Sequence, residues 1–309
     1  MQVTNTILMI RPVGFRMNEQ TAVNNFFQED LDIKNAEINL KAQKEFDGFA
    51  EILKSKGINV IVVNDTNEPD TPDSIFPNNW ISFHENGTVG LYPMFAENRR
   101  DERREDVLDI LENHGFIIND IVDYTSAEKD GFFLEGTGSI LLDRINKKAY
   151  CALSDRADEE LFIEFCEDFD YFPVVFTANQ SVDGKRMPIY HTNVMMCLGE
   201  TFSVICSDAI DNKKERKIVL DHLNNDGKEI IRISEQQMHQ FAGNMLQVLG
   251  KDNKRYLVMS SSAYNSLTQE QIKSLTKYSE IIHSSLETIE ACGGGSARCM
   301  MAEIFLPKK

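Results

Sequence analysis

Five stretches of the chain share one pattern of polar and apolar positions. Each opens with small or polar residues and then enters a short apolar run. In the first four, a turn signal and a second apolar run follow, which predicts a β-hairpin. The five stretches are residues 78–93, 134–154, 190–207, 242–260 and 293–306. The fifth contains a single apolar run and predicts one strand.

A helical pattern follows each predicted hairpin, and a short apolar strand comes after it, as at residues 173–178 and 229–234. The predicted helices cover residues 98–115, 154–169, 208–227 and 266–278. The first is expected to end at Gly115, and the second to begin at a cap formed by Ser154 or Asp155.

The N-terminal segment supplies a strand at 6–12, a helix from residue 18 onward and a strand at 58–64. These parts would complete the fifth unit and close a ring between the two ends of the chain. The pattern therefore predicts an α/β protein built from five repeats.

One polar residue stands at the mouth of each of the five stretches. These residues are Asn79, Glu135, His191, Asn244 and Cys299, and their separations are 56, 56, 53 and 55 residues. A near-constant period of this size is typical of propellers and repeat arrays. Five units in a ring would aim these side chains at a common centre. Hairpins and helices also alternate in many other α+β proteins, so the pattern alone leaves that alternative open.

The composition narrows the classes of partner. The chain has 309 residues, of which 42% are hydrophobic and 26% are charged, as in a soluble globular protein. A formal net charge of -17 argues against nucleic acid and anionic membranes as partners. No stretch approaches the roughly 20 apolar residues that span a bilayer, and no signal-peptide pattern opens the sequence. We therefore expect a cytosolic protein that acts on a small molecule; a homo-oligomer stays open.

The spacing of the cysteines does not indicate a function. The six stand at positions 151, 166, 197, 206, 292 and 299 with no CxxC pair among them. Neither a metal site nor a disulfide framework is indicated by that distribution.

If the ring forms, Glu135, His191 and Cys299 converge on one place. A cysteine nucleophile, a histidine that carries protons and a carboxylate that orients the histidine are the parts of nucleophilic catalysis. Each residue alone has a structural explanation, since a lone cysteine is most often a small buried hydrophobe. The shared period favours the three acting together.

Three segments resemble the signatures of the guanidino-group modifying enzymes, the pentein superfamily, which includes arginine deiminases, amidinotransferases and dimethylarginine hydrolases. They are "LEGTGS", "YHTNVMM" and "GGGSARCM". The resemblance covers essentially the whole chain and implies one catalytic domain over residues 1–309, folded as a five-bladed α/β propeller with pseudo-five-fold symmetry. It also implies a covalent thiouronium-type intermediate on Cys299, with His191 as general acid and base, Glu135 as the partner of His191, and no metal or organic cofactor.

Further positions match the same enzymes. "PDSIFPNNW" is similar to a segment of dimethylarginine hydrolases in which two aspartates bind the guanidinium group; Asp73 matches the first, and Asn79 stands at the second. "NRRDE" and "LSDR" resemble segments that place arginines near the substrate α-carboxylate, which suggests Arg100, with Arg99 as the alternate, and Arg156. Arginines on a solvated helix start are the alternative interpretation.

The chain differs from the deiminases at their His-x-Asp motif. Here the motif reads His191-Thr192-Asn193, so asparagine stands where the deiminases have aspartate. Asparagine at 79 and 193 removes two negative charges from the head-group pocket. A guanidinium group only donates hydrogen bonds, whereas a ureido group also presents a carbonyl oxygen that an amide can satisfy.

The main hypothesis is therefore hydrolysis of the ureido group of citrulline, or of a close analogue, to give ornithine, ammonia and carbon dioxide. The chain resembles the citrulline-utilisation hydrolase branch in this respect. The alternatives are an arginine deiminase or dimethylarginine-type hydrolase, an amidinotransferase, and a propeller that binds a protein or ribosomal partner without catalysis.

Overall fold

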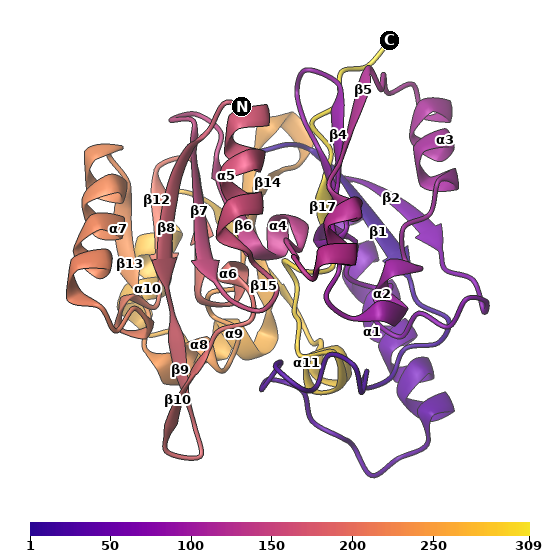
Figure 1. The fold of residues 1–309 in the computed structure, drawn as a ribbon, viewed down its shortest axis with the longest axis horizontal. Helices are drawn as coiled ribbons and strands as arrows, with labels where there is room; N and C mark the ends of the chain where they lie inside the picture. The colour runs from indigo at the N-terminus through magenta and orange to yellow at the C-terminus, as the bar shows by residue number, and fades with distance from the viewer.

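The computed structural model describes residues 1–309, which form an α/β fold of small sheets with helices around them (Figure 1). The strands are β1 (Thr6–Arg11), β2 (Asn59–Asn64), β3 (Ile81–Phe83), β4 (Thr88–Leu91), β5 (Asp120–Asp123), β6 (Ile140–Asp143), β7 (Lys148–Leu153), β8 (Phe172–Thr177), β9 (Asn179–Val182), β10 (Lys185–Pro188), β11 (Met196–Leu198), β12 (Phe202–Ile205), β13 (Glu229–Arg232), β14 (Leu246–Leu249), β15 (Arg255–Ser260), β16 (Glu280–Ser284) and β17 (Ala302–Glu303). The helices are α1 (Asn35–Ser55), α2 (Glu97–Arg100), α3 (Asp106–Asn113), α4 (Gly136–Ser139), α5 (Glu159–Asp168), α6 (Thr192–Met195), α7 (Lys213–Asn225), α8 (Glu235–Met238), α9 (Ser261–Ser266), α10 (Gln269–Leu275) and α11 (Glu287–Gly293).

Five three-stranded sheets share one construction. In each sheet the central strand pairs antiparallel with one neighbour and parallel with the other. The strand orders are β17-β1-β2, β3-β4-β5, β6-β7-β8, β11-β12-β13 and β14-β15-β16, and β9 and β10 form a separate ribbon. The four predicted hairpins are thus confirmed as antiparallel pairs. The two ends of the chain meet in the first sheet, where Ile7 pairs with Glu303 and Leu8 with Ala302.

The predicted helix from residue 18 onward is wrong at its start. Residues 18–34, here called the cover loop, form a series of turns, and α1 begins only at Asn35. Asparagine side chains explain the difference. Asn18 Oδ1 accepts from the backbone N–H of Gln20, and Asn25 Oδ1 accepts from that of Phe27, both at 3.1 Å. Such local bonds compete with the helical ladder.

Two other helix boundaries also differ from the prediction. The segment 98–115 contains two helices, α2 and α3, and Gly115 follows the second with a φ of +85°. The cap of α5 is Asp158, not Ser154 or Asp155, because its carboxylate accepts from the backbone N–H groups of Glu160 and Leu161.

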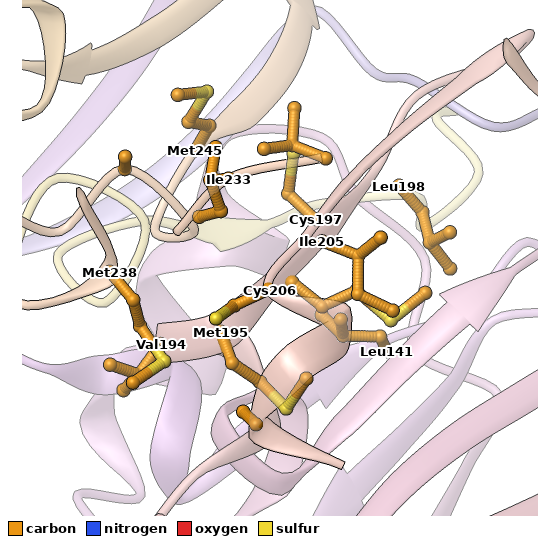
Figure 2. Close-up of a cluster of buried hydrophobic side chains, with 14 of the residues drawn as sticks. Leu141, Val194, Met195, Cys197, Leu198, Ile205, Cys206, Ile233, Met238 and Met245 are labelled. Atoms are coloured by element: carbon orange, nitrogen blue, oxygen red, sulfur yellow. The ribbon is translucent and has the colours of Figure 1, made fainter. Parts of the chain in front are cut away.

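The largest apolar core surrounds β11 and β12 and anchors α6 (Figure 2). Met195 of α6, Cys197 of β11 and Ile205 of β12 are buried in it together with Leu141 of β6. Burial raises the pKa of the Cys197 thiol to about 12, so this cysteine stays protonated at neutral pH. Because Val194 and Met195 of α6 are buried in this core, α6 is fixed in position, and so is His191, which immediately precedes it. Figure 1 shows α4 and α6 near the middle of the molecule.

A buried ion pair joins two of the sheets. Lys228, just before β13, places Nζ 3.0 Å from Asp143 Oδ2 at the end of β6, and both side chains are fully buried. Lys228 Nζ also donates to the carbonyl oxygens of Gly199 and Glu200, each at 2.9 Å. All its donors are therefore used, as buried charges require.

We expect Lys228→Met to lower the free energy of unfolding by about 3–5 kcal/mol, because it leaves the Asp143 carboxylate buried without a cation. Urea denaturation measures this. Lys277→Met is the control, since it breaks an ion pair with Glu229 in which the lysine side chain is half exposed. Equal losses in both variants would contradict a special cost of the buried charge.

None of the helices combines the length and the apolar character that crossing a membrane requires. No group of three or more histidine, cysteine, aspartate or glutamate side chains is placed to hold a metal ion.

Candidate active site

A buried carboxylate–imidazole pair forms the first part of the site. Glu135 precedes α4 and His191 precedes α6, so the two residues enter from neighbouring hairpins. His191 Nε2 lies 2.7 Å from Glu135 Oε2, and Glu135 Oε1 accepts from the backbone N–H of Phe95 at 3.0 Å. The structure therefore joins two of the three predicted catalytic residues directly.

The charges around this pair determine its protonation. Burial raises the pKa of Glu135, but Arg156, His191 and Arg99 outweigh it and lower that pKa to about 2. Burial lowers the pKa of His191 to about 4, although Glu135 acts in the opposite direction. At neutral pH the resting pair is thus a carboxylate with a neutral imidazole. Nε2 carries the imidazole proton toward Glu135, and Nδ1 is left with a free lone pair.

Gly138 allows close packing around this imidazole. A side chain at Gly138 would place its Cβ 2.8 Å from His191 Nδ1 and 2.5 Å from Asn79 Nδ2. Glycine therefore lets Asn79 and the free face of His191 approach the same point. Asn79 is itself oriented by Arg99, whose Nη1 donates to Asn79 Oδ1 at 2.9 Å.

Arg99 and Arg156 flank the carboxylate of Glu135. Their Nη1 atoms lie 3.7 Å and 3.6 Å from Glu135 Oε2, and both side chains are buried. Arg99 also makes a bidentate ion pair with Glu102, at 2.8 Å and 2.9 Å. Arg156 instead donates to Asn24 Oδ1 and to the carbonyl oxygen of Thr21. Its guanidinium is thus bound by the cover loop.

Asp73 carries a buried carboxylate oxygen without a partner. Asn18 Nδ2 and Thr21 Oγ1 donate to its Oδ2, at 2.9 Å and 3.2 Å, while Oδ1 has no hydrogen-bond partner. Arg99 is the nearest cation, with Nε 3.9 Å from Oδ2. Burial raises the pKa of Asp73 above its ordinary value. A cationic donor at Oδ1 would remove that penalty.

Two asparagine amides surround the sulfur of Cys299. Asn244 Nδ2 lies 3.2 Å from Sγ, and Asn193 Nδ2 lies 3.5 Å from it. The side chain of Cys299 is almost completely buried, and its backbone N–H donates to the carbonyl oxygen of Ser296 in a tight turn. Because Asn193 follows His191 by two residues, α6 connects the sulfur to the carboxylate–imidazole pair.

The glycines that precede this turn contact protein atoms. Gly294 has a φ of +59°, and a Cβ there would lie 2.5 Å from Asn25 of the cover loop. A Cβ at Gly293 or Gly295 would meet the ring of Phe76 at 2.7 Å or 2.9 Å. The three glycines thus allow the 296–299 turn to pack beside Phe76 and under the cover loop.

Arg100 lies outside this cluster, contrary to the prediction. Its Nε donates to the carbonyl oxygen of Met94 at 3.2 Å, near Glu128, and its side chain is partly exposed. Adjacent residues of a helix point in different directions, so only one of the two arginines can face the site. Arg99, the predicted alternate, occupies the buried position.

The prediction also missed Glu102 and the cover-loop residues Asn18, Thr21 and Asn24. The "RRDE" motif contained a usable signal for Glu102, because residues three apart on a helix or turn face each other and Arg99 pairs with Glu102 in that way. The cover loop gave no such signal, since its asparagines match both loop and cap patterns.

The arrangement contains the groups needed for covalent catalysis at a carbon bound to nitrogen. Cys299 supplies a sulfur, His191 supplies a basic nitrogen held by Glu135, and Asp73 offers an acceptor to a cationic donor. The surroundings are buried, which strengthens each electrostatic interaction.

A protein-family model described as N,N dimethylarginine dimethylhydrolase, eukaryotic, matches residues 11–306. No curated protein sequence matches the chain. Among solved structures it is similar to apo ArgZ, an arginine dihydrolase from the ornithine–ammonia cycle in cyanobacteria, with a TM-score of 0.73 at 17% identity over 98% of this chain.

Two further solved structures give the same result. AgrE in a ternary complex with ornithine and NAD+ matches with a TM-score of 0.73 at 18% identity, over 98% of this chain. A dimethylarginine dimethylaminohydrolase adduct with S-methyl-L-thiocitrulline matches with a TM-score of 0.66 at 13% identity, over 98% of this chain and 100% of that one. This chain spans only 41% of the ArgZ chain and 40% of the AgrE chain. At these identities the likeness concerns the fold.

Proposed function

The chain belongs to the N,N-dimethylarginine dimethylhydrolase family, and from this premise we propose that it hydrolyses the guanidino group of an arginine-type amino acid. It is a hydrolase of the pentein superfamily, which acts on amidine-type C–N bonds through a covalent cysteine intermediate. In our proposal Cys299 is the nucleophile, His191 the proton carrier, and Glu135 the carboxylate that holds His191.

The unpartnered oxygen of Asp73 is the observation that carries this choice of substrate. Two arginines, Arg99 and Arg156, serve three buried acids, Asp73, Glu102 and Glu135. Arg99 comes no closer than 3.9 Å to Asp73 Oδ2, and Asp73 Oδ1 is left without any donor. A substrate guanidinium would supply both an N–H donor and a positive charge to Oδ1. The description of ArgZ as an arginine dihydrolase, and the ornithine bound by AgrE, agree with an arginine-type substrate.

The proposed reaction uses the proton balance of the resting site. The thiol proton of Cys299 passes to Nδ1 of His191, and the thiolate attacks the guanidino carbon. The imidazolium then gives this proton to the departing nitrogen as the C–N bond breaks, which leaves a thiouronium-type adduct. In the second half, His191 takes a proton from water and the hydroxide attacks the same carbon. The C–S bond then breaks with its electron pair going to sulfur, and the imidazolium proton returns to the Cys299 thiolate, which restores the resting site. Glu135 stabilises the imidazolium in both halves.

A ureido substrate is the second candidate, and the amides at 79 and 193 favour it. Arg99 holds Asn79 Oδ1, and Asn79 Nδ2 donates one hydrogen bond to Asn78 Oδ1 at 3.1 Å. The same nitrogen lies beside Gly138 and the face of His191, with its second N–H left to donate. An N–H donor there suits the carbonyl oxygen of citrulline, or the oxyanion that forms from it. Hydrolysis of citrulline would release ornithine, ammonia and carbon dioxide.

A substrate panel separates these candidates. Arginine, methylated arginines, agmatine and citrulline are each incubated with the enzyme, and ornithine, citrulline, ammonia and amines are quantified. We expect turnover of a guanidino compound. Citrulline formed with ammonia from arginine would indicate a deiminase, and citrulline formed with an amine from a methylated arginine would indicate a dimethylarginine-type hydrolase. Turnover of citrulline alone would establish the second candidate. Turnover of no compound would favour a propeller that binds a partner without catalysis.

We expect Asn79→Asp to shift the preference toward guanidino substrates. The ratio of kcat/KM for arginine to kcat/KM for citrulline should rise roughly ten- to a hundredfold, because a carboxylate attracts a cation and cannot donate to a ureido oxygen. Steady-state kinetics with both substrates measures the ratio, with Asn113→Asp at an exposed position as control. An unchanged ratio would show that Asn79 does not select the head group.

We also propose that the five sheets are the blades of a propeller with pseudo-five-fold symmetry, and that residues 1–309 act as one catalytic domain. The strand order common to all five sheets and the near-constant period of the mouth residues support this arrangement. The cytosolic location and the oligomeric state stay predictions from the sequence.

A further inference from the structure

Asn244 is the one mouth residue to which the proposed mechanism assigns no role. It lies between a turn at Phe241 and strand β14, and its side chain is fully buried. Its backbone N–H donates to the carbonyl oxygen of Phe241 at 2.8 Å. A buried amide has one acceptor oxygen and two N–H donors to satisfy.

The partners of Asn244 determine which way its amide points. Oδ1 accepts from the backbone N–H of Arg298 at 2.9 Å, and Nδ2 donates to the carbonyl oxygen of Asn193 at 3.0 Å. Turning the amide over would set two donors against each other at Arg298 and two acceptors at Asn193. The network therefore excludes the reversed orientation. The remaining N–H faces Cys299 Sγ at 3.2 Å.

Asn193 contacts the same sulfur with both polar atoms of its side-chain amide. Its Nδ2 lies 3.5 Å from Sγ and its Oδ1 3.8 Å from it, so this amide can donate to the sulfur or accept from it. Asn244 can only donate. A donor with no acceptor alternative stabilises a thiolate more than a thiol, and the buried sulfur has little water to take its place.

We propose that Asn244 is a catalytic residue that stabilises the thiolate of Cys299 through an N–H hydrogen bond to Sγ. This inference rests on the proposed function, in which Cys299 is the nucleophile. The bond forms when the thiol loses its proton, and it forms again when the C–S bond breaks and the electron pair returns to sulfur. Because Arg298 adjoins Cys299 in sequence, its N–H also fixes the amide next to the nucleophile.

Two variants test the inference. Asn244→Asp keeps an oxygen for the Arg298 N–H but replaces the donor at Sγ with an acceptor, and Asn244→Ala removes the whole amide. The rate of Cys299 alkylation by iodoacetamide is followed across a pH series by mass spectrometry, together with kcat/KM.

We expect alkylation of Cys299 at neutral pH to slow roughly tenfold or more in Asn244→Ala, as for loss of one hydrogen bond to an anion. The midpoint of the alkylation profile should move up by about one pH unit or more, and further in Asn244→Asp. The exposed control Asn265→Asp should match the wild type. Lower turnover with an unshifted profile would overturn the inference, since Asn244 would then only support the fold. Unchanged turnover would overturn it as well.

A measurement on the wild type covers the case in which both variants fail to fold. With ¹⁵N-labelled asparagine, the side-chain amide resonance assigned to Asn244 should titrate together with Cys299 alkylation, and this titration should vanish in Cys299→Ser. No titration at Asn244, or titration at Asn193 alone, would overturn the inference. The proposed function fails by a different result, namely turnover that survives Cys299→Ser.

Discussion

Cys299→Ser should reduce turnover by roughly 10⁴-fold or more while the protein stays folded, as expected for loss of a covalent nucleophile. A serine hydroxyl is almost never ionised at neutral pH, and the neutral imidazole of His191 is too weak a base to ionise it fully. The two amides at Asn193 and Asn244 would then face a neutral oxygen. Release of ornithine or citrulline measures the rate, and mass spectrometry in the presence of substrate should detect the adduct on the wild type only.

The remaining cysteines provide the control for this prediction. Cys206 and Cys292 are buried, and burial raises the pKa of each thiol to about 11, so neither is a thiolate at neutral pH. Cys206→Ala and Cys292→Ala should lower thermal stability and leave kcat unchanged. A near-native rate in Cys299→Ser would show that the covalent mechanism does not use this residue.

The sequence alone predicted the parts of the site that follow from local pattern and period. Two short apolar runs separated by turn residues predict a hairpin, so the four antiparallel pairs could be predicted with their approximate bounds. The period also predicted that Glu135 and His191 belong together, and their side chains meet at 2.7 Å. Such contacts are predictable because each repeat places its mouth residue shortly before the first strand of the hairpin.

Features that depend on tertiary partners could not be predicted in this way. Arg99 and Arg100 differ by one position, and only the burial of Asn79 and Glu102 decides which of them faces inward. The cover loop has no helical period, and its asparagines bond to Asp73 and Arg156 across the molecule. Amide orientation at Asn244 likewise requires knowledge of the Arg298 and Asn193 backbones.

The negative charge of Glu135 is what supports protonation of His191, and the groups around Glu135 maintain that charge. It accepts one bond from the Phe95 backbone and one from His191, and two buried arginines stand within 4 Å. These groups keep Glu135 ionised down to its pKa of about 2. Glu135 is also the group that opposes the effect of burial on His191. Removing the charge would therefore make the imidazolium harder to form.

Glu135→Gln should for this reason lower kcat by roughly 10³- to 10⁴-fold, as when a neutral amide replaces the carboxylate that orients a catalytic histidine. The glutamine NH₂ can donate to Nε2 and thereby move the imidazole proton to Nδ1, the nitrogen that must accept a proton from Cys299. Single-turnover kinetics on a guanidino substrate measures the effect on the first chemical step.

Glu128→Gln is a matched control, because Glu128 also accepts from a backbone N–H, that of Met94, and also pairs with an arginine, Arg103, yet lies outside the catalytic cluster. This control should retain wild-type kcat. If Glu135→Gln and Glu128→Gln lose activity only in proportion to lost thermal stability, then Glu135 is a structural acid, and His191 must obtain its proton affinity from another group. A selective loss in Glu135→Gln, with both proteins folded, instead places the negative charge of Glu135 in the proton transfer itself.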